Sequence, residues 1–163
     1  MSINAYMTAT GKVQGPISGS CQIQGHQNQM LVYKYEHEIN IPTNIQTGQP
    51  TGARHHGPVK VTKMVDEASP LLAQALCTGE VLTDVKIMFM IINANGKPQN
   101  YYTVELKNAI VTSIAFDNPM TLLPSNGPLE FMETIMFVYE SYTATDEIKS
   151  KQMTDSWLNG GGG

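Results

Sequence analysis

The side chains that could build a catalytic or metal site are few and scattered in this sequence. His55 and His56 are adjacent, which suggests metal ligands, but neighbouring side chains diverge on an extended chain and no cysteine or carboxylate cluster lies near them. Asp66 and Glu67 suggest a carboxylate pair for acid-base chemistry. Both stand just ahead of Ser69, where we expect a helix to begin, so attraction to the positive end of that helix explains them better.

Other signatures of chemistry are absent from the sequence. It contains no G-x-S-x-G elbow, no Walker loop, no G-x-G-x-x-G and no H-E-x-x-H motif. His26 and His37 have no sequence partner that would make either one the base of a triad. We therefore expect no catalytic residue, no cofactor and no metal.

Composition narrows the class of protein. The 163 residues are 41% hydrophobic, which suits one domain with a full core, and only 15% are charged, against about 25% in an average soluble protein. A net charge of −4 argues against nucleic acid as a partner. We expect neither a signal peptide nor a membrane span, because no basic region precedes an apolar run and no long apolar stretch occurs. Cys21 and Cys77 are accordingly expected to stay reduced.

The stretch 51–82 contains the one helix that the sequence predicts. Ser69 is a candidate N-cap, and Pro70 suits the first helical position because it has no N–H to leave unpaired. Gly79 suits the left-handed residue that ends a helix. The apolar side chains between them share one face: Leu72, Ala75 and Leu76. A helix over residues 70–78 is about 13 Å long, too short to be stable alone, so we expect that face to pack on β-sheet.

Alternating apolar residues predict β-strands along the rest of the chain. The expected strands cover residues 3–7, 31–39, 59–65, 81–93, 99–107, 110–116 and 129–143, with weaker ones near Cys21 and at 148–153. Asn95-Gly96 favours a type I′ turn, which joins 81–93 to 99–107 as a hairpin. Such a chain buries its apolar faces only by stacking two sheets or closing a barrel, so we expect a mainly β, mostly antiparallel fold.

The alternation also assigns faces to these strands. In 31–39 the odd positions share one face, and in 129–143 one face carries Leu129, Phe131, Ile135, Phe137 and Tyr139. The outward faces then hold Val32, Met88, Met90 and Ile92. A monomer seldom tolerates so much exposed apolar surface, so we expect a homo-oligomer.

Two loops rich in helix and strand breakers also carry apolar residues. The loop 40–58 has three prolines and three glycines, yet contains Ile41 and Ile45, which gain nothing from exposure to water. We interpret it as a docking loop, with a flap folded over its own domain as the alternative. The loop 117–128 repeats the pattern with three apolar residues: Met120, Leu122 and Leu123.

Arg54 lies in the first of these loops. Its guanidinium has five donors in a fixed geometry, which suits carboxylate or carbonyl oxygens on a neighbouring subunit or ring. A carboxylate of its own chain is the competing partner. The two alternatives differ in whether Arg54 serves assembly or stability.

The motifs around the helix resemble one protein family. The run Thr51-Gly52-x-Arg54-x-His56-x-Pro58 precedes Thr62-Lys63-x-x-Asp66-x-x-Ser69-Pro70-x-Leu72, and Gly79 closes the helix. With HEINIP ending at Pro42, the Asn-Gly hairpin and Asp155-Ser156-Trp157, nearly the whole chain resembles the haemolysin-coregulated protein (Hcp) family of the bacterial type VI secretion system.

This resemblance implies a two-sheet antiparallel β-barrel flanked by one helix at about Pro70 to Thr78. It also implies a six-membered ring, with rings stacked into a tube inside a contractile sheath and capped by a trimeric spike protein. Such tubes pass from the cytoplasm to the extracellular space or a target cell without a signal peptide, and small effectors sit in the ring lumen. We expect one domain at 1–159, a flexible glycine tail at 160–163, no fused toxin and no membrane insertion.

The expected function is therefore that of a structural, tube-forming and effector-carrying protein and not of an enzyme. A free-standing secreted effector, or an unrecognised hydrolase on the same barrel, is the alternative. The docking loop supplies the expected subunit or ring interface: Ile41, Pro42, Ile45, Thr51, Gly52, Arg54, His56 and Pro58. The helix supplies cap and core residues: Ser69, Pro70, Leu72, Leu76 and Gly79.

Overall fold

The computed structural model describes residues 2–156, so Trp157 and the predicted glycine tail lie outside the described residues. Its strands are β1 (Ser2–Gly11), β2 (Gly15–Ile17), β3 (Met30–Glu36), β4 (Ile39–Asn40), β5 (His55–His56), β6 (Val59–Met64), β7 (Leu82–Ile92), β8 (Pro98–Asp117), β9 (Met132–Val138), β10 (Ser141–Asp146) and β11 (Lys151–Ser156). The helices are α1 (Ser69–Thr78) and a short 3-10 helix, η1 (Pro124–Asn126). Neither helix of this range has the length and apolar character needed to cross a membrane.

Strand β8 organises the fold because it bends near its middle. Asn108 lies at the bend with a φ of 50°, in the left-handed region that asparagine tolerates better than most residues. Before the bend β8 pairs with β10, and after it β8 pairs with β9. The turn from β9 to β10 lies at the same place, where Asn108 Nδ2 donates to Glu140 Oε2 at 2.7 Å. The predicted strands 99–107 and 110–116 are therefore one strand, and the predicted strand 129–143 is two.

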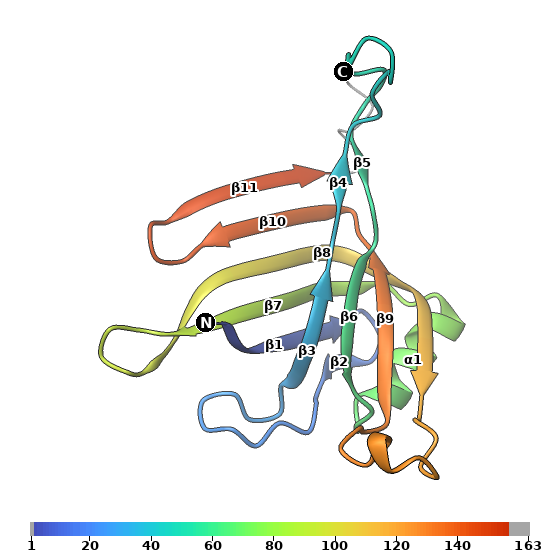
Figure 1. Ribbon diagram of the computed structural model, residues 1–163, viewed down its shortest axis with the longest axis vertical. Helices are drawn as coiled ribbons and strands as arrows, with labels where there is room; N and C mark the ends of the chain where they lie inside the picture. The colour runs from blue at the N-terminus through green and yellow to red at the C-terminus, as the bar shows by residue number, and fades with distance from the viewer. Residues whose placement is uncertain (1, 157–163) are drawn as a thin grey trace.

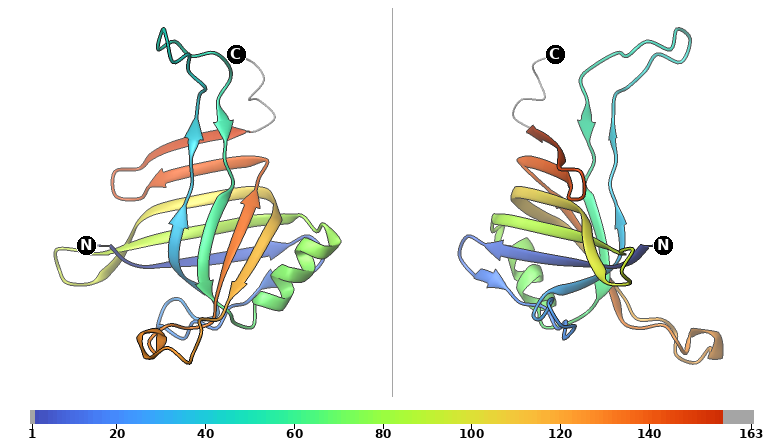
Figure 2. Two further views of the ribbon diagram at one scale, coloured as in Figure 1. Left: turned by 45° about the vertical axis from the view of Figure 1, so that its right-hand side comes forward. Right: turned by 90° about the vertical axis from the view of Figure 1, so that its left-hand side faces the viewer.

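The pairing closes a barrel and leaves an extension beside it. From β8 the order runs through β7, β1, β3, β6 and β9, and β9 returns to β8. All of these pairs are antiparallel. Strands β10 and β11 continue from the first half of β8 beyond the barrel wall (Figures 1 and 2). The predicted antiparallel β-barrel with one short helix is confirmed.

The barrel interior and the helix share one core. Side chains of β6 and β9 alternate between buried and partly exposed, and Val61, Ile135 and Phe137 are fully buried. Leu72 and Ala75 of α1 are also fully buried in this core, and Leu76 packs against it. The predicted apolar face of the helix therefore covers the sheet.

Gly79 ends α1 as predicted, with a φ of 70° and with its N–H directed at the Leu76 carbonyl. Ser69, however, is not the N-cap. It is the first helical residue, and the cap position, Ala68, makes no side-chain capping bond. Asp66 acts instead in the turn before the helix, where its Oδ1 accepts the Ala68 N–H at 2.9 Å. Because Asp66 binds the Ala68 N–H, the Ser69 hydroxyl can bind other partners.

A β-bulge reverses the predicted faces of β3. The register against β6 shifts between Val32 and Lys34, so Met30 and Val32 are buried before the bulge, whereas Tyr35 packs on the core after it. The prediction that the odd positions share a buried face, with Val32 outward, is therefore wrong before the bulge and holds for Tyr35 after it, because one extra residue exchanges the two faces.

The outward methionines of β7 are covered within the chain. Met90 is only 6% exposed and packs with Tyr6 and Cys21 in a second apolar cluster, to which Met88 also belongs. The segment 18–29, which forms no strand, supplies Cys21 to this cover. Ile92 alone of the predicted outward residues is largely exposed, at 48%. These methionines therefore give no argument for oligomerisation.

Two further local predictions need correction. Leu129 and Phe131 are exposed rather than facing the core with Ile135, because β9 begins only at Met132. The hairpin at Asn95-Gly96 forms, but not with a type I′ turn, since Gly96 has a positive φ and Asn95 does not. The side chain of Asn93 supports this turn by accepting the N–H groups of Asn95 and Lys97.

The packing of α1 leads to a first prediction. Leu72→Asp places an unpaired charge at a fully buried position and should cost more than about 3 kcal/mol of unfolding free energy. Leu71→Asp, one residue away but 36% exposed, is the matched control and should cost less than about 1 kcal/mol. Urea unfolding followed by circular dichroism measures both. Equal stability of the two variants would show that the helix does not pack as described.

Candidate functional site

The loop 40–58 forms an ordered arm. We call residues 39–56 the arm: its base is the β4–β5 pair, and Thr43 bridges Pro50 further out. At its tip, Asn44 Oδ1 accepts the Gln46 N–H at 2.8 Å, as in an Asx turn. Ile45 is 99% exposed there, and the arm projects beyond the barrel (Figures 1 and 2). Despite its breakers the loop thus contains short paired segments, and the alternative of a flap folded over its own domain is wrong.

The other interface residues predicted on this loop lie along the arm or at its foot. Thr51 donates to the Pro42 carbonyl through its N–H and its hydroxyl, at 2.8 and 3.2 Å, which holds the two sides of the arm together. Ile41 and Gly52 are exposed, and Pro58 is partly buried next to β6.

Arg54 binds a carboxylate of its own chain. Its guanidinium donates two hydrogen bonds to Asp155 of β11, from Nε to Oδ2 and, at 2.6 Å, from the terminal nitrogen to Oδ1. The Asp155 side chain is only 17% exposed. Of the two partners considered for Arg54, the structure has the one within the chain, and the predicted contact with a neighbouring subunit is not needed to satisfy it.

A chain of hydrogen bonds continues inward from Asp155. His56 Nε2 lies 2.7 Å from Asp155 Oδ2, and its Nδ1 lies 2.6 Å from the Tyr139 hydroxyl. That hydroxyl is also 2.8 Å from His37 Nε2. We call His37, Arg54, His56, Tyr139 and Asp155 the base cluster. It joins the base of the arm to the end of β9 and to β11.

The surroundings of the base cluster shift several pKa values. Hydrogen bonds from Arg54, and then from His56, hold the pKa of Asp155 well below its usual range. Burial, together with the nearby His56, lowers the pKa of His37. Burial raises the pKa of Tyr139. The cluster therefore favours an ionised Asp155, a neutral His37 and a protonated Tyr139.

Asp155, His56 and Tyr139 repeat the carboxylate, imidazole and hydroxyl order of a nucleophilic triad. Tyr139, however, is only 3% exposed, and its raised pKa disfavours the phenolate. The hydroxyl cannot reach a substrate in this position, so the arrangement serves to hold the arm. Within residues 2–156 no group of three or more His, Cys, Asp and Glu side chains is placed to hold a metal ion.

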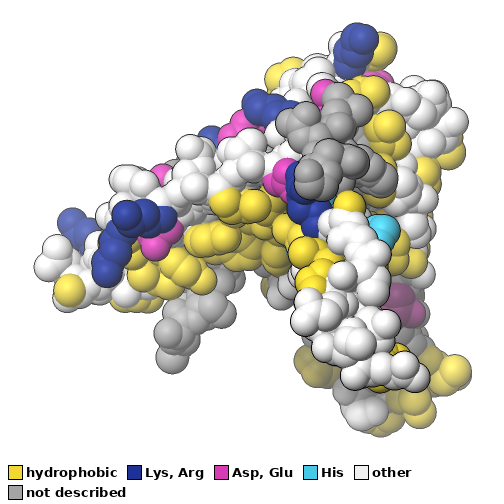
Figure 3. All heavy atoms as spheres, turned by 90° about the horizontal axis from the view of Figure 1, so that it is seen from above, with side chains coloured by type: hydrophobic (Ala, Val, Ile, Leu, Met, Phe, Trp, Pro, Cys, Tyr) yellow, Lys and Arg dark blue, Asp and Glu magenta, His cyan; other side chains and the backbone are white. Residues whose placement is uncertain are grey.

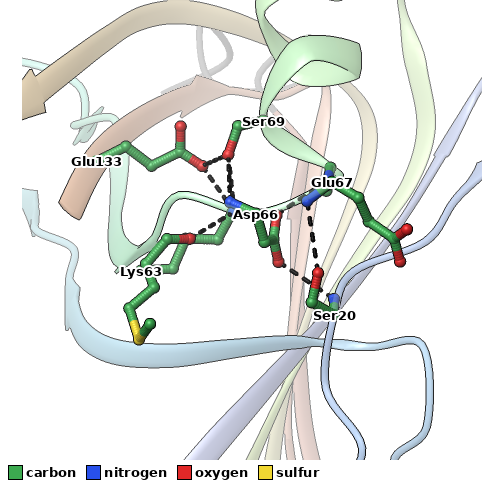
Figure 4. Close-up of polar contacts among 8 residues, drawn as sticks. Ser20, Lys63, Asp66, Glu67, Ser69 and Glu133 are labelled. Carbon is green, nitrogen blue, oxygen red and sulfur yellow. Dashed lines mark hydrogen bonds and ion pairs between the residues drawn. The ribbon is translucent and has the colours of Figure 1, made fainter. Parts of the chain in front are cut away.

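A second polar cluster lies under the start of α1 (Figure 4). Lys63 Nζ, fully buried, is 2.6 Å from Glu133 Oε1 and 2.8 Å from Asp66 Oδ1. The Ser69 hydroxyl donates to the same Glu133 oxygen at 2.7 Å and accepts the Asp66 N–H at 2.9 Å. We call Lys63, Asp66, Ser69 and Glu133 the helix anchor, because it joins β6 and β9 to the first turn of α1.

The helix anchor also reaches the segment before β3. Ser20 donates its N–H to Asp66 Oδ2 at 3.3 Å, and the Glu67 N–H points to the Ser20 hydroxyl at 3.4 Å (Figure 4). The side chains of Asp66 and Glu67 thus do not act as a pair. Lys63 and Ser69 are residue types that can act as a catalytic base and a nucleophile. Both are buried, so we interpret this cluster too as structural.

The other apolar loop lies at the opposite end of the molecule from the arm. Met120, Leu122 and Leu123 are 62%, 88% and 49% exposed, and η1 shapes the loop that carries them. Phe116 and Phe131 lie beside its base with ring centroids 6.2 Å apart. Figure 1 shows this loop and the arm at the two ends of the long axis.

The sequence did not indicate most partners in these clusters. Tyr139 and Glu133 carry no motif, and they lie 83 and 64 residues along the chain from His56 and Ser69. Asp155 was part of the family resemblance, but nothing in its local sequence connects it to Arg54. Only the buried positions of Glu133 and Lys63 in alternating strands gave a signal, because a charge at a core position requires a partner.

The helix anchor generates a prediction about stability. Lys63→Met or Glu133→Leu alone leaves buried charge uncompensated and should cost about 3–5 kcal/mol, whereas the double variant should cost much less than the sum of the two. The exposed pair Lys34 and Glu36, 3.0 Å apart, is the control, and Lys34→Met should cost less than about 1 kcal/mol. Additive losses for the buried pair in urea titrations would contradict the coupling.

Comparison with known proteins assigns the chain to a family. Residues 6–145 match the family model described as "Type VI secretion system effector, Hcp". The chain is 38% identical to the "Major exported protein" of Pseudomonas aeruginosa over 96% of both chains.

Solved structures agree with this match. The chain is similar to one described as "Crystal structure of Hcp protein", with a TM-score of 0.89, 25% identity and coverage of 96% of this chain and 98% of that one. It is also similar to "Secreted protein Hcp3 from Pseudomonas aeruginosa", with a TM-score of 0.79, 32% identity and coverage of 96% and 99%. The protein therefore belongs to the Hcp family of type VI secretion system proteins.

Proposed function

We propose that this protein builds the tube of a type VI secretion system, as hexameric rings that stack and are exported. The observation that carries the proposal is the pair of unlike apolar ends. The arm presents Ile45 at one end of the long axis, and the loop with Leu122 lies at the other (Figure 1). Two different apolar surfaces on opposite ends favour a head-to-tail contact, which repeats along an axis.

The sheet extension offers a lateral surface for closing a ring. Cross-strand neighbours form an apolar row from the core outward, in which Ile87 pairs with Val104, Val104 with Ala144, and Ala144 with Met153. The first three are buried, whereas Met153 on the last strand is 44% exposed. Figure 3 shows hydrophobic side chains gathered along the concave side of the molecule as seen from above. An apolar row that continues into solvent at a strand edge suits a neighbouring subunit.

Family membership extends this proposal to partners. The proposed partners are a contractile sheath around the tube, a spike protein at its tip and small effectors in the ring lumen. We infer that the protein is exported because its relative is named "Major exported protein". The hydroxyl groups that could serve as nucleophiles, those of Tyr139 and Ser69, are on buried residues, which supports a structural role over the hydrolase alternative.

The mass of the purified protein tests the ring. Six chains of 17.9 kDa give about 107 kDa, which light scattering after size-exclusion chromatography separates easily from a monomer. A 17.9 kDa species at micromolar concentration would exclude the ring and favour a free-standing effector.

The arm tip should govern stacking. Ile45→Asp replaces a fully exposed apolar contact with a charge, so we expect folded rings of normal mass that need at least about tenfold higher concentration to stack, the equivalent of about 1.4 kcal/mol. Ile45→Leu, which keeps the apolar surface, should stack like the wild type. Electron microscopy over a concentration series measures this, and normal stacks of Ile45→Asp would remove the arm tip from the interface.

A further inference from the structure

The hydrogen bonds of the base cluster limit where its protons can lie. Asp155, ionised, only accepts, so His56 Nε2 must donate to it. A neutral His56 then has an unprotonated Nδ1, which accepts the single proton of the Tyr139 hydroxyl. Tyr139 oxygen is thereby left as an acceptor for the N–H of His37 Nε2. Both histidines are neutral in this arrangement. His37 also faces the backbone of Gly57, so a neutral His37 can instead donate there and accept the Tyr139 proton through Nε2.

The cluster can hold one added proton but not two. A proton on His56 reverses the hydroxyl, which then donates to a neutral His37, so the bonds survive. With both imidazoles charged, both N–H groups point at the Tyr139 oxygen, and the hydroxyl proton has no acceptor between them. The two ring centroids are 6.4 Å apart, and Arg54 adds a third cation. Among the described residues, Asp155 is the one carboxylate in an ion pair with Arg54 or His56.

We propose that the base cluster is an acid-sensitive latch, which holds the arm against β11 while His37 and His56 share at most one proton and releases it when both are charged. The latch acts within one chain, so it is independent of whether rings form. The segment that it holds is the arm, and mild acid releases the arm.

The pH window follows from the neighbours. Burial and His56 lower the pKa of His37, while the backbone of Gly57 opposes this shift. Because the latched pKa is below the free histidine value of about 6.5, latching is fully favourable above about pH 6.5 and is lost as the pH falls through the latched pKa. The pKa of Asp155 is also lowered, first by Arg54, so its contribution is lost only below about pH 4.

Other groups packed on the histidines do not titrate in this window. Tyr142 of β10 stacks on His37 with centroids 4.7 Å apart, and Tyr35 of β3 lies behind it. Burial raises the pKa of Tyr35, Tyr139 and Tyr142, so all three stay neutral. Glu36 and Glu38, the chain neighbours of His37, are exposed and bind Lys34 and Asn40 instead.

Arg54 makes the latch directly testable, because it is the only arginine in the sequence. An arginine-specific protease can cut the chain only after Arg54, and only when the guanidinium has left Asp155. We expect wild-type protein to resist cutting at pH 7.5 and to be cut at least tenfold faster at pH 5.0, after correction with a peptide of residues 50–58.

Two variants complete the experiment. His37→Gln offers Tyr139 a donor that does not titrate, so it should resist cutting at both pH values. Asp155→Asn weakens the hold on Arg54 and should be cut at both, which also shows that assembly does not shield the site. Cutting by a lysine-specific protease after the fully buried Lys63 reports global unfolding and should be absent at pH 5.0.

The proposal fails on any of four results. These are equal cutting of the wild type at the two pH values, cutting of His37→Gln at pH 5.0 at the wild-type rate, protection of Asp155→Asn at pH 7.5, and cutting after Lys63 in step with Arg54. The last would assign the acid response to unfolding of the whole barrel.

Discussion

The bend of β8 at Asn108 is the constraint on which the architecture depends. A straight strand of this length could not pair with both β10 and β9. A single residue in the left-handed region lets the first half of β8 pair with β10 and the second half with β9. The same bend fixes the turn at Glu140, so the strand that closes the barrel continues directly into the extension. Without it, β11 would not stand beside the base of the arm.

That placement decides how the arm is held. A two-stranded ribbon is marginal by itself in water, and this one is held by the short β4–β5 pair, the bridge from Thr43 to Pro50 and a few hydrogen bonds near its tip. The bonds from Arg54 and His56 to Asp155 supply what the ribbon lacks, and Tyr139 ties the same point to the barrel. The direction of the arm is thus set by residues about a hundred positions away in sequence and not by its own turn chemistry.

The reach of sequence reasoning ends where interactions become long-range. The end of α1 at Gly79, the strand β6 and the Asn-Gly hairpin follow from residues that are neighbours in sequence, and they were predictable. The bulge in β3 was not, because its signal is the register against β6. Ser69 fits an N-cap by type, yet its hydroxyl belongs to a cluster completed by Glu133, which only the closed barrel brings near. Arg54 was ambiguous for the same reason: its carboxylate is on the last described strand.

The two polar clusters stand at opposite ends of β6, which makes this strand the link between the ends of the molecule. Its first residue follows the foot of the arm, and Lys63 near its other end holds the helix anchor. Between them Val59 and Val61 are fully buried in a closed, densely packed barrel, which resists deformation. The barrel therefore fixes the distance between the base of the arm and the opposite apolar loop, whereas the base cluster sets the direction of the arm. A stack of such units would repeat with one geometry only while the base cluster holds the arm in that direction.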